Sequence, residues 1–438
     1  MDVGGIRSGR AKARAVSLAG SLLASASLVG CGSLFDLAGA DNSQNQTDAA
    51  CHATALSDRY IVKWRDGSVT SETAKTHEEF AERIFEPNKY KIEYAERDHL
   101  VRLTPPATVQ QESSTSPAMG WGQSITNAPA EWRAGNQGSG VIVAVVDSGA
   151  DVNHPQLASQ LAGNPGEIGF DAAGRDKSFN GVDDDGNGLI DDAYGYDFYQ
   201  KASLVGDANG HGTHVSGIIA ANPSMGPIQG MAPRAKILPI AFMGADGAGL
   251  LSDSVLAIRY AVARGAKVIN ASWGGTSCTQ LLQTTVARLS AQGVLFVVAA
   301  GNNGDGLQPR GADLARIPVF PAAFGLTTQM VVGASTPQDH MAAFSNFSSS
   351  LVDLVAPGEL IVSTWPGGGT RSMDGTSMAT PFVSGAAAML WAYRPKATPA
   401  QIKAALLAGV DPGAFAVASQ GRLDVRAAIQ ALGSTVAP

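Results

Sequence analysis

The sequence predicts an α/β fold in which a mainly parallel central sheet is covered by helices. Short apolar runs rich in β-branched residues are typical of strands buried on both faces, and they recur at residues 141–146, 236–242, 267–272, 294–300 and 330–334. Helix-like stretches separate them, and two of these stretches, 252–264 and 279–292, end at Gly265 and Gly293 in the position of a C-terminal cap. Buried strands that alternate with helices favour a parallel sheet.

The composition agrees with one large folded body and some appendages. Of the 438 residues, 45% are hydrophobic and 16% are charged, which excludes global disorder. The net charge of −7 gives no indication of a nucleic-acid partner. Three cysteines are too few for a disulfide-stapled scaffold or a four-cysteine zinc site.

Residues 1–30 have the pattern of an export signal. Basic residues between Arg7 and Arg14 precede an uncharged segment, residues 15–30, that is too short to span a membrane. The segment ends in Leu-Val-Gly-Cys31, which resembles the lipobox of bacterial lipoproteins and implies a lipid anchor on Cys31. The resemblance places the protein in the cell envelope, at the outer membrane if the cell has one. The alternative is an ordinary secretory signal that happens to carry a cysteine.

Three further segments precede the main body. Residues 31–57 are small and polar and predict a tether. Residues 58–104 predict a compact α+β unit, with strands at 60–64 and 100–103 and a helix at 76–85. Residues 105–120 predict a linker, and the main body runs from 121 to 434. The α+β unit is too small to hold a large core alone, so we expect it to fold against another surface.

Polar residues stand where ligand sites form in parallel sheets, beyond the carboxyl ends of the strands. Asp147 and Asn302 each follow a predicted strand, while His211 and Ser377 lie in glycine-rich segments that look like the openings of helices. Each of these residues alone has an ordinary explanation as a turn or cap residue. His211 and His214 could also be two metal ligands, although the other histidines offer no obvious third.

Taken together, the flanking sequences resemble those of the subtilisin-like serine peptidases. The motifs VAVVDSGAD, NGHGTHVSG, INASWGG, VVAAGNNG and DGTSMATPFVSGAAA occur in this order within residues 121–434. The resemblance implies a subtilisin-like three-layer fold and a serine endopeptidase that acts on polypeptide substrates. Two alternatives are a peptide ligase that uses the same acyl-enzyme and an envelope binding protein on an inactive protease scaffold. The complete set of catalytic residues argues against the second alternative.

The chemistry of these residues agrees with peptide hydrolysis. Ser377 needs an adjacent base, His211 can take its proton, and Asp147 can hold the imidazole in the correct tautomer. The backbone N–H of Ser377 and, by resemblance, the Asn302 side chain would stabilise the oxyanion. The resemblance also implies that substrate adds as a β-strand along edges formed by Ser272, Trp273, Gly274, Gly247, Gly249, Ala300 and Gly301. Trp273 could equally be a core residue.

The densest acidic stretch, residues 180–192, predicts a structural calcium site. Asp183, Asp185, Asn187 and Gly188 match the D-x-D-x-N-G spacing of a calcium loop. Because the twelfth position is not Glu, Asp191 or Asp192 would have to close the ligand shell. The predicted ligands are Asp183, Asp185, Asn187, Leu189, Asp191 and Asp192. The alternative is a solvated acidic turn.

The α+β unit, residues 58–104, resembles the inhibitor-like propeptide of this family, which assists folding and is removed by the enzyme. If the linker is cut, the mature enzyme leaves a Cys31 anchor behind. Cys51 and Cys278 could form a disulfide that keeps the two pieces joined, but we expect two free thiols, because proximity cannot be read from a sequence.

Overall fold

The computed structural model describes residues 55–103, 109–110, 120–204, 206–302 and 310–434. The chain divides into residues 1–30 and residues 31–438, and all described residues belong to the second unit. The predicted export signal, Cys31, most of the tether and most of the linker lie outside the described residues. Within the described part of the chain, no helix combines the length and the apolar character needed to cross a membrane.

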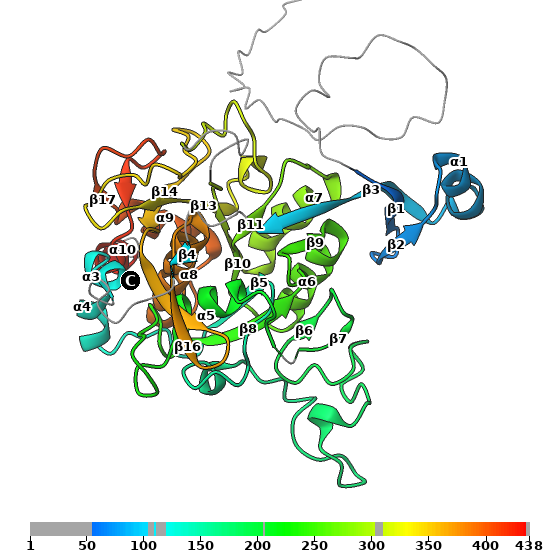
Figure 1. The fold of residues 1–438 in the computed structure, drawn as a ribbon, viewed down its shortest axis with the longest axis horizontal. Helices are drawn as coiled ribbons and strands as arrows, with labels where there is room; N and C mark the ends of the chain where they lie inside the picture. The colour runs from blue at the N-terminus through cyan, green and yellow to red at the C-terminus, as the bar shows by residue number, and fades with distance from the viewer. Residues whose placement is uncertain (1–54, 104–108, 111–119, 205, 303–309, 435–438) are drawn as a thin grey trace, which may run out of the picture. The chain divides into compact units, whose positions relative to one another are not determined.

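A ten-stranded sheet forms the centre of the main body (Figure 1). Its eight inner strands pair in parallel, while short antiparallel strands close each edge. In spatial order they are β17 (Asp411–Pro412), β18 (Gly421–Arg422), β14 (Leu354–Pro357), β13 (Gln329–Ser335), β12 (Leu295–Ala299), β10 (Val268–Ala271), β5 (Ile142–Asp147), β8 (Lys236–Ala241), β6 (Tyr196–Asp197) and β7 (Ala202–Ser203). The mainly parallel sheet is confirmed, and the five strands predicted for the main body occur within one residue of their expected bounds.

Helices cover both faces of this sheet, which gives the three layers. On β5, Val143 and Val145 pack against α5 (His211–Ala220) and α8 (Thr376–Tyr393). Ala144 and Val146 point to the other face, where they belong to the same core as α6 (Leu251–Ala263) and α7 (Gln280–Leu289). Because successive side chains of a strand point to opposite faces, a continuous apolar run fills both cores.

The predicted glycine caps occur after these helices. Gly265 follows α6 with a φ of +78°, and Gly293 ends the 3-10 turn η5 (Ser290–Gln292) after α7 with a φ of +80°. These left-handed conformations favour glycine. Two further helices, α9 (Pro399–Ala408) and α10 (Val425–Ser434), add apolar residues to the core beneath α5 and α8.

Residues 55–103 form a small N-terminal module with a sheet of its own. The strands are β1 (Ala55–Trp64), β2 (Val69–Thr73) and β3 (Ile92–Leu103), and the predicted helix is found as α1 (His77–Phe80), a π-turn (Ala81–Phe85) and α2 (Glu86–Asn88). Tyr60, Val62 and Phe80 belong to the module's own core. Ile61 and Val101, in contrast, are buried in the core that the main body forms around α6 and α7.

The last residues of β3 extend the module into the main body (Figure 1). They pair in an antiparallel manner with β9 (Ala248–Leu250) on one side and β11 (Trp273–Gly274) on the other. Two carboxylates of β3 strengthen this contact. Asp98 accepts hydrogen bonds from Ser252 at the start of α6, and Glu96 accepts them from the backbone N–H groups of Gln280 and Leu281 at the start of α7. A carboxylate at a helix N-terminus is favoured by the helix dipole.

The expectation of a free thiol at Cys278 is wrong, because Cys278 is disulfide-bonded in the structure. Its partner lies outside the described residues. The pairing depends on how the main body and the segment before β1 come together, which local sequence does not encode.

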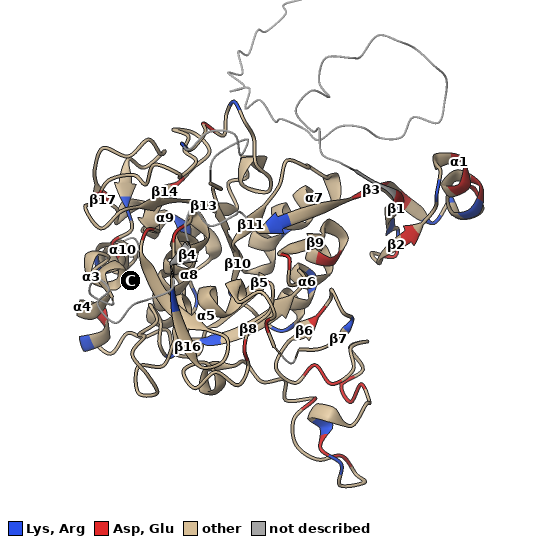
Figure 2. Ribbon diagram, in the orientation of Figure 1, with Lys and Arg blue, Asp and Glu red and all other residues tan. Residues whose placement is uncertain are grey.

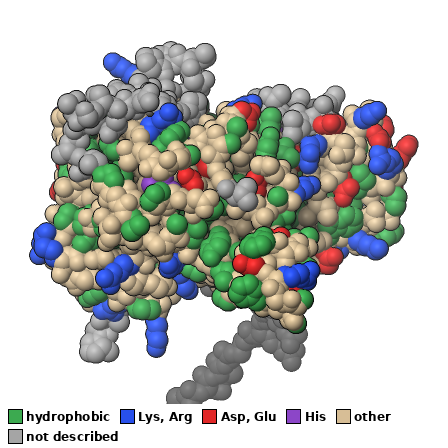
Figure 3. Space-filling view, turned by 60° about the horizontal axis from the view of Figure 1, so that its bottom comes forward, with side chains coloured by type: hydrophobic (Ala, Val, Ile, Leu, Met, Phe, Trp, Pro, Cys, Tyr) green, Lys and Arg blue, Asp and Glu red, His purple; other side chains and the backbone are tan. Residues whose placement is uncertain are grey.

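Charged side chains are dispersed over the surface of the main body. On the face shown in Figure 3, basic and acidic groups are interspersed with hydrophobic ones, and no single basic patch dominates.

Candidate active site

A buried carboxylate–imidazole pair lies at the carboxyl end of the central strand β5. Asp147 is the last residue of β5 and His211 is the first residue of α5; their side chains are completely and almost completely buried. Nδ1 of His211 lies 2.8 Å from Oδ1 and 3.0 Å from Oδ2 of Asp147. Oδ1 also accepts a hydrogen bond of 2.8 Å from the backbone N–H of Ser148. The carboxylate therefore fixes both the position and the tautomer of the imidazole.

A second buried carboxylate, Asp207, holds the start of α5 against the turn after β5. It accepts hydrogen bonds from the backbone N–H groups of Gly210 and Thr213 and from the Ser148 hydroxyl. The packing is tight, because a Cβ added at Gly212 would lie 2.1 Å from the carbonyl oxygen of Gly149. Only glycine fits at position 212, and the contact brings the imidazole close to Asp147.

Ser377 lies in the first turn of α8, on the same edge of the sheet. Its hydroxyl donates a hydrogen bond of 3.0 Å to the carbonyl oxygen of Ser272, and the Ser272 hydroxyl donates one of 2.9 Å to the Ser377 carbonyl. That carbonyl is available because Pro381, four residues on, has no N–H to donate to it. Nε2 of His211 is buried and has no hydrogen-bond partner among the described residues, so the Ser377 hydroxyl is not hydrogen-bonded to the imidazole in this structure.

Asn302, which follows β12, is oriented by Thr376 of α8. Oδ1 of Asn302 accepts hydrogen bonds of 2.9 Å from both the backbone N–H and the hydroxyl of Thr376. The Thr376 hydroxyl in turn accepts one from the backbone N–H of Gly301. Nδ2 of Asn302 would lie 3.3 Å from a Cβ at Gly375, so the amide donor faces the helix turn that carries Ser377. The first N–H groups of a helix have no acceptor within the helix, and the N–H of Ser377 belongs to this set.

The end of β3 occupies the place where an added substrate strand was expected. Val101 pairs with Gly249, Arg102 pairs with Gly274, and the backbone N–H of Leu103 donates a hydrogen bond of 2.8 Å to the carbonyl of Gly247. Val101 is only 1% exposed. The two predicted edges are therefore paired with the chain's own residues.

Trp273 serves both of the roles that its sequence position allowed. Its side chain is fully buried, its indole N–H donates to the carbonyl of Val146, and its ring packs edge-to-face against Phe242. Its backbone belongs to β11, which pairs with Leu103. Of the other expected substrate-edge residues, Ala300 accepts a hydrogen bond from the Asn346 side chain, which supports the turn into Asn302.

The two histidines of α5 differ in their electrostatic surroundings. Burial by itself would lower the pKa of His211, but the charge of Asp147, its hydrogen bond to Nδ1 and the charge of Asp207 reverse this effect, so the pKa lies above its usual range. Burial lowers the pKa of His214 to about 3, and its Nε2 lies within 3.1 Å of the carbonyl oxygens of Ile361 and Arg371. His214 is thus a neutral structural residue rather than a metal ligand.

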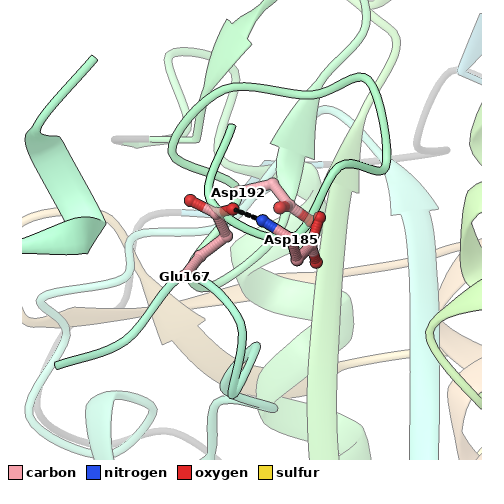
Figure 4. Close-up of side chains that lie close together, drawn as sticks. All are labelled: Glu167, Asp185 and Asp192. Carbon is pink, nitrogen blue, oxygen red and sulfur yellow. Dashed lines mark hydrogen bonds between the residues drawn. The ribbon is translucent and has the colours of Figure 1, made fainter. Parts of the chain in front are cut away.

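Acidic residues also gather in the loops between β5 and β6, as Figure 2 shows. Glu167, Asp185 and Asp192 converge there, and one carboxylate oxygen from each lies within 4.8 Å of the others (Figure 4). Glu167 and Asp192 are fully buried. Oε1 of Glu167 accepts backbone N–H bonds from Asp184 and Asp185, while its Oε2 is buried without a hydrogen-bond partner among the described residues. Burial raises the pKa of Glu167, and the negative charges of Asp185 and Asp192 raise it further.

This cluster differs from the predicted ligand set. Asp185 and Asp192 belong to it, and the Asn187 amide lies 3.1 Å from both of their carboxylates. Asp183 instead accepts backbone N–H bonds from residues 186–188 and holds its own turn, and Asp191 accepts one from Gly181. The Leu189 N–H bonds to the Asn187 side chain. Glu167, which lies outside the predicted loop, supplies the third carboxylate of the cluster.

The sequence patterns did not identify three residues that belong to these sites. Thr376 stands beside Ser377 in the DGTSMAT motif and Asp207 stands just before NGHGTH, so nearness to the motifs was a usable signal for both. Glu167 lies 18 residues before Asp185, and no local pattern connects the two.

A model of the subtilase family matches residues 138–421. The major intracellular serine protease of Bacillus subtilis (strain 168) is 37% identical over 294 residues, which covers 67% of this chain and 81% of that protein. Subtilisin BL of Lederbergia lenta is 35% identical over 284 residues, which covers 65% of this chain and 88% of that protein. Thermitase of Thermoactinomyces vulgaris is 35% identical over 272 residues, which covers 62% and 81%, respectively.

We predict that the His211 imidazole titrates above about pH 6.5, the ordinary value for histidine, because Asp147 and Asp207 favour its charged form. NMR of the ring nitrogens in Ser377→Ala protein measures this titration. In Asp147→Asn protein the His211 pKa should fall. Burial still lowers this pKa, and the negative charge of Asp147 no longer raises it. His214 is an internal control and should stay neutral to about pH 5. A His211 pKa below 6.5 in the protein with Asp147 would contradict the assignment.

Proposed function

This chain belongs to the subtilase family and is a subtilisin-like serine endopeptidase, and we propose that it hydrolyses peptide bonds through an acyl-enzyme on Ser377. The observation that carries this proposal is the buried pair of Asp147 and His211 at the start of α5, which packs against α8, the helix that carries Ser377 in its first turn. All three residues stand at the carboxyl edge of one parallel sheet, where such sites form.

In the first chemical step, the Ser377 hydroxyl attacks the substrate carbonyl. The hydroxyl first leaves the Ser272 carbonyl by rotating about its Cα–Cβ bond and then gives its proton to Nε2 of His211. The Asp147 carboxylate accepts a hydrogen bond from Nδ1–H of His211 and stabilises the imidazolium. The imidazolium protonates the leaving amine. A water molecule, activated by the same imidazole, then hydrolyses the ester.

Two donors would stabilise the negative oxygen of the tetrahedral intermediates. One is the backbone N–H of Ser377, at the positive end of α8. The other is Nδ2 of Asn302, whose direction is set because Thr376 occupies the Oδ1 side of the amide. Donors that are already oriented need no reorganisation when charge develops on the substrate.

Substrates would bind as an extended strand between β9 and β11, in the position that the end of β3 now holds. Backbone pairing with both neighbours gives affinity with little dependence on sequence. We propose that residues 58–104 are a propeptide that inhibits the enzyme by occupying these edges. Cleavage by the enzyme itself within residues 105–120 would then begin activation.

The cluster of Glu167, Asp185 and Asp192 suits a hard divalent cation, and we propose structural calcium. Three carboxylates this close repel one another, and the buried, unpaired Oε2 of Glu167 is costly without a partner. Calcium prefers carboxylate and carbonyl oxygens in flexible arrangements. Arg264 and Tyr260 already donate hydrogen bonds to Oδ2 of Asp192 and hold this carboxylate in place.

We also propose that the protein is exported and anchored through a lipid on Cys31, in the envelope of a bacterial cell. This proposal is supported by the signal-like composition of residues 1–30 and the lipobox that ends in Cys31. After cleavage of the linker, the catalytic body would be released from the anchor unless another bond still joins it to the N-terminal fragment.

The proposed nucleophile can be tested by labelling processed enzyme with a fluorophosphonate. Label should appear on the wild-type chain and be lost in Ser377→Ala, because the reagent reacts with an activated serine hydroxyl. Ser349→Ala, at an exposed serine, should label normally. Labelling that persists in Ser377→Ala would show that another residue is the nucleophile.

Replacement of Asn302 by alanine should lower kcat by about 10²–10³, the cost of losing one such donor in subtilisin, with little change in KM. The donor acts on charge that develops only in the transition state, so binding of the substrate should be spared. Steady-state kinetics measure both constants, with Asn153→Ala, at an exposed asparagine, as the control. An unchanged kcat would remove Asn302 from the mechanism.

Removal of calcium should destabilise the folded chain. In Ser377→Ala protein, which cannot digest itself, saturating calcium at a hundredfold its Kd should add about 2.7 kcal/mol to the free energy of unfolding, and EDTA should abolish this gain. Thermal unfolding of Glu167→Gln should respond much less to calcium, whereas Glu131→Gln, on the surface of helix α4 (Ala128–Arg133), should respond like the parent. A thermal midpoint that is the same in EDTA and in calcium would exclude a structural cation.

A further inference from the structure

Cys278 connects two parts of the contact between the N-terminal module and the main body. It lies between β11, which pairs with the end of β3, and Thr279, the N-cap of α7. It is partly buried against the core around α6 and α7, and it is disulfide-bonded. The start of α7 is also where Glu96 of β3 accepts its two backbone hydrogen bonds. The disulfide is therefore attached at the rim of the surface on which β3 docks.

The number of cysteines in the chain limits which residue can be the disulfide partner of Cys278. The chain has three cysteines, at positions 31, 51 and 278, so the partner of Cys278 is residue 31 or residue 51. Both precede β1. In either case the bond joins the segment before the N-terminal module to the main body, and it does so independently of the backbone through residues 104–119.

Chain length and register favour Cys51. Ala55, the first residue of β1, pairs with His99 of β3, next to the part of β3 that docks on β9. Four residues separate positions 51 and 55, a reach of at most about 14 Å. The same docked strand passes Cys278 on its other side, since Leu103 pairs with Trp273 and Glu96 bonds to Gln280.

We propose that a Cys51–Cys278 disulfide keeps the inhibitory module covalently attached to the catalytic body after the linker is cut. This inference rests on the proposed inhibitory role of residues 58–104. Without the bond, a cut within residues 105–120 would leave two chains that separate on dilution. With the bond, the module stays at an effective concentration in the millimolar range, whatever the enzyme concentration.

The bond makes release of the inhibitor a redox step. Formation of the disulfide from two thiols gives up two electrons and two protons to a disulfide oxidant, of the kind found in oxidising extracytoplasmic compartments. Release requires a dithiol reductant, which returns two electrons and two protons and is itself oxidised to a disulfide. The alternative is a second peptide cleavage, either within the module or between Cys51 and the module. An anchor on Cys31 would retain the catalytic body for as long as the disulfide lasts.

The connection can be tested on inactive protein, so that the result does not depend on the proposed catalytic residues. A Ser377→Ala chain with a recognition sequence for a specific protease inserted in residues 111–119 is cut with that protease, and free thiols are then blocked. Electrophoresis without reductant should show one band of full mass, and electrophoresis with reductant should show two fragments. Cys51→Ser and Cys278→Ser should each give two fragments without reductant, whereas Cys31→Ser should give one band.

Two results would overturn the proposal. Two fragments without reductant from the chain with all three cysteines would show that no disulfide bridges the cut. Separation in Cys31→Ser combined with a single band in Cys51→Ser would show that the partner is Cys31.

The consequence for inhibition is measured separately on active, linker-cleaved enzyme. Specific activity should stay low and unchanged on a hundredfold dilution, and it should rise on dilution after reduction or in Cys278→Ser. An activity that rises equally on dilution with and without the disulfide would overturn covalent inhibition. An absence of activity in every sample, reduced or not, would instead count against the proposed function, and the electrophoresis result would still stand.

Discussion

The candidate site depends on one buried interaction, the hydrogen-bonded pair of Asp147 and His211. A carboxylate without any exposed surface must be compensated by partners, because an unpaired buried charge is strongly destabilising. The imidazole Nδ1–H and the backbone N–H of Ser148 provide that compensation, and Asp207 anchors both the Ser148 hydroxyl and the start of α5. The turn after β5 and the start of α5 are consequently held together, and the catalytic geometry follows from satisfying the carboxylate.

The contacts of Ser377 depend on one backbone N–H donor that α8 lacks, at Pro381. Because Pro381 cannot bond to the Ser377 carbonyl, that carbonyl accepts the Ser272 hydroxyl, and Ser272 thereby joins β10 and β11 to the start of α8. The Ser377 hydroxyl in turn donates a hydrogen bond to the Ser272 carbonyl. In this arrangement the Ser377 hydroxyl has an acceptor and makes no hydrogen bond to Nε2 of His211. In the proposed mechanism, the hydroxyl would rotate toward Nε2 once a substrate displaces β3.

The N-terminal module pairs with two strand edges of the main body that would otherwise be open. The facing backbones of β9 and β11 are unpaired strand edges, which readily accept another strand. The end of β3 fills this gap from within the same chain, and its acidic residues also satisfy the first N–H groups of α6 and α7. The same contacts explain how a module with a small core of its own is held in the structure, since Val101 and Ile61 are buried in the main body.

The sequence by itself determined the strands of the sheet, the glycine caps and the positions of Asp147, His211, Ser377 and Asn302. Such features are local: a run such as residues 294–300 is apolar because both faces of its strand are buried, and short motifs carry the turn geometry around each polar residue. Only the tertiary structure decided which distant residues meet. Glu167 joins Asp185 and Asp192 across a folded loop, Trp273 has its ring in the core and its backbone on a strand edge, and Cys278 is disulfide-bonded rather than free. These features arise from the packing of whole elements against one another, and no short window of sequence records that packing.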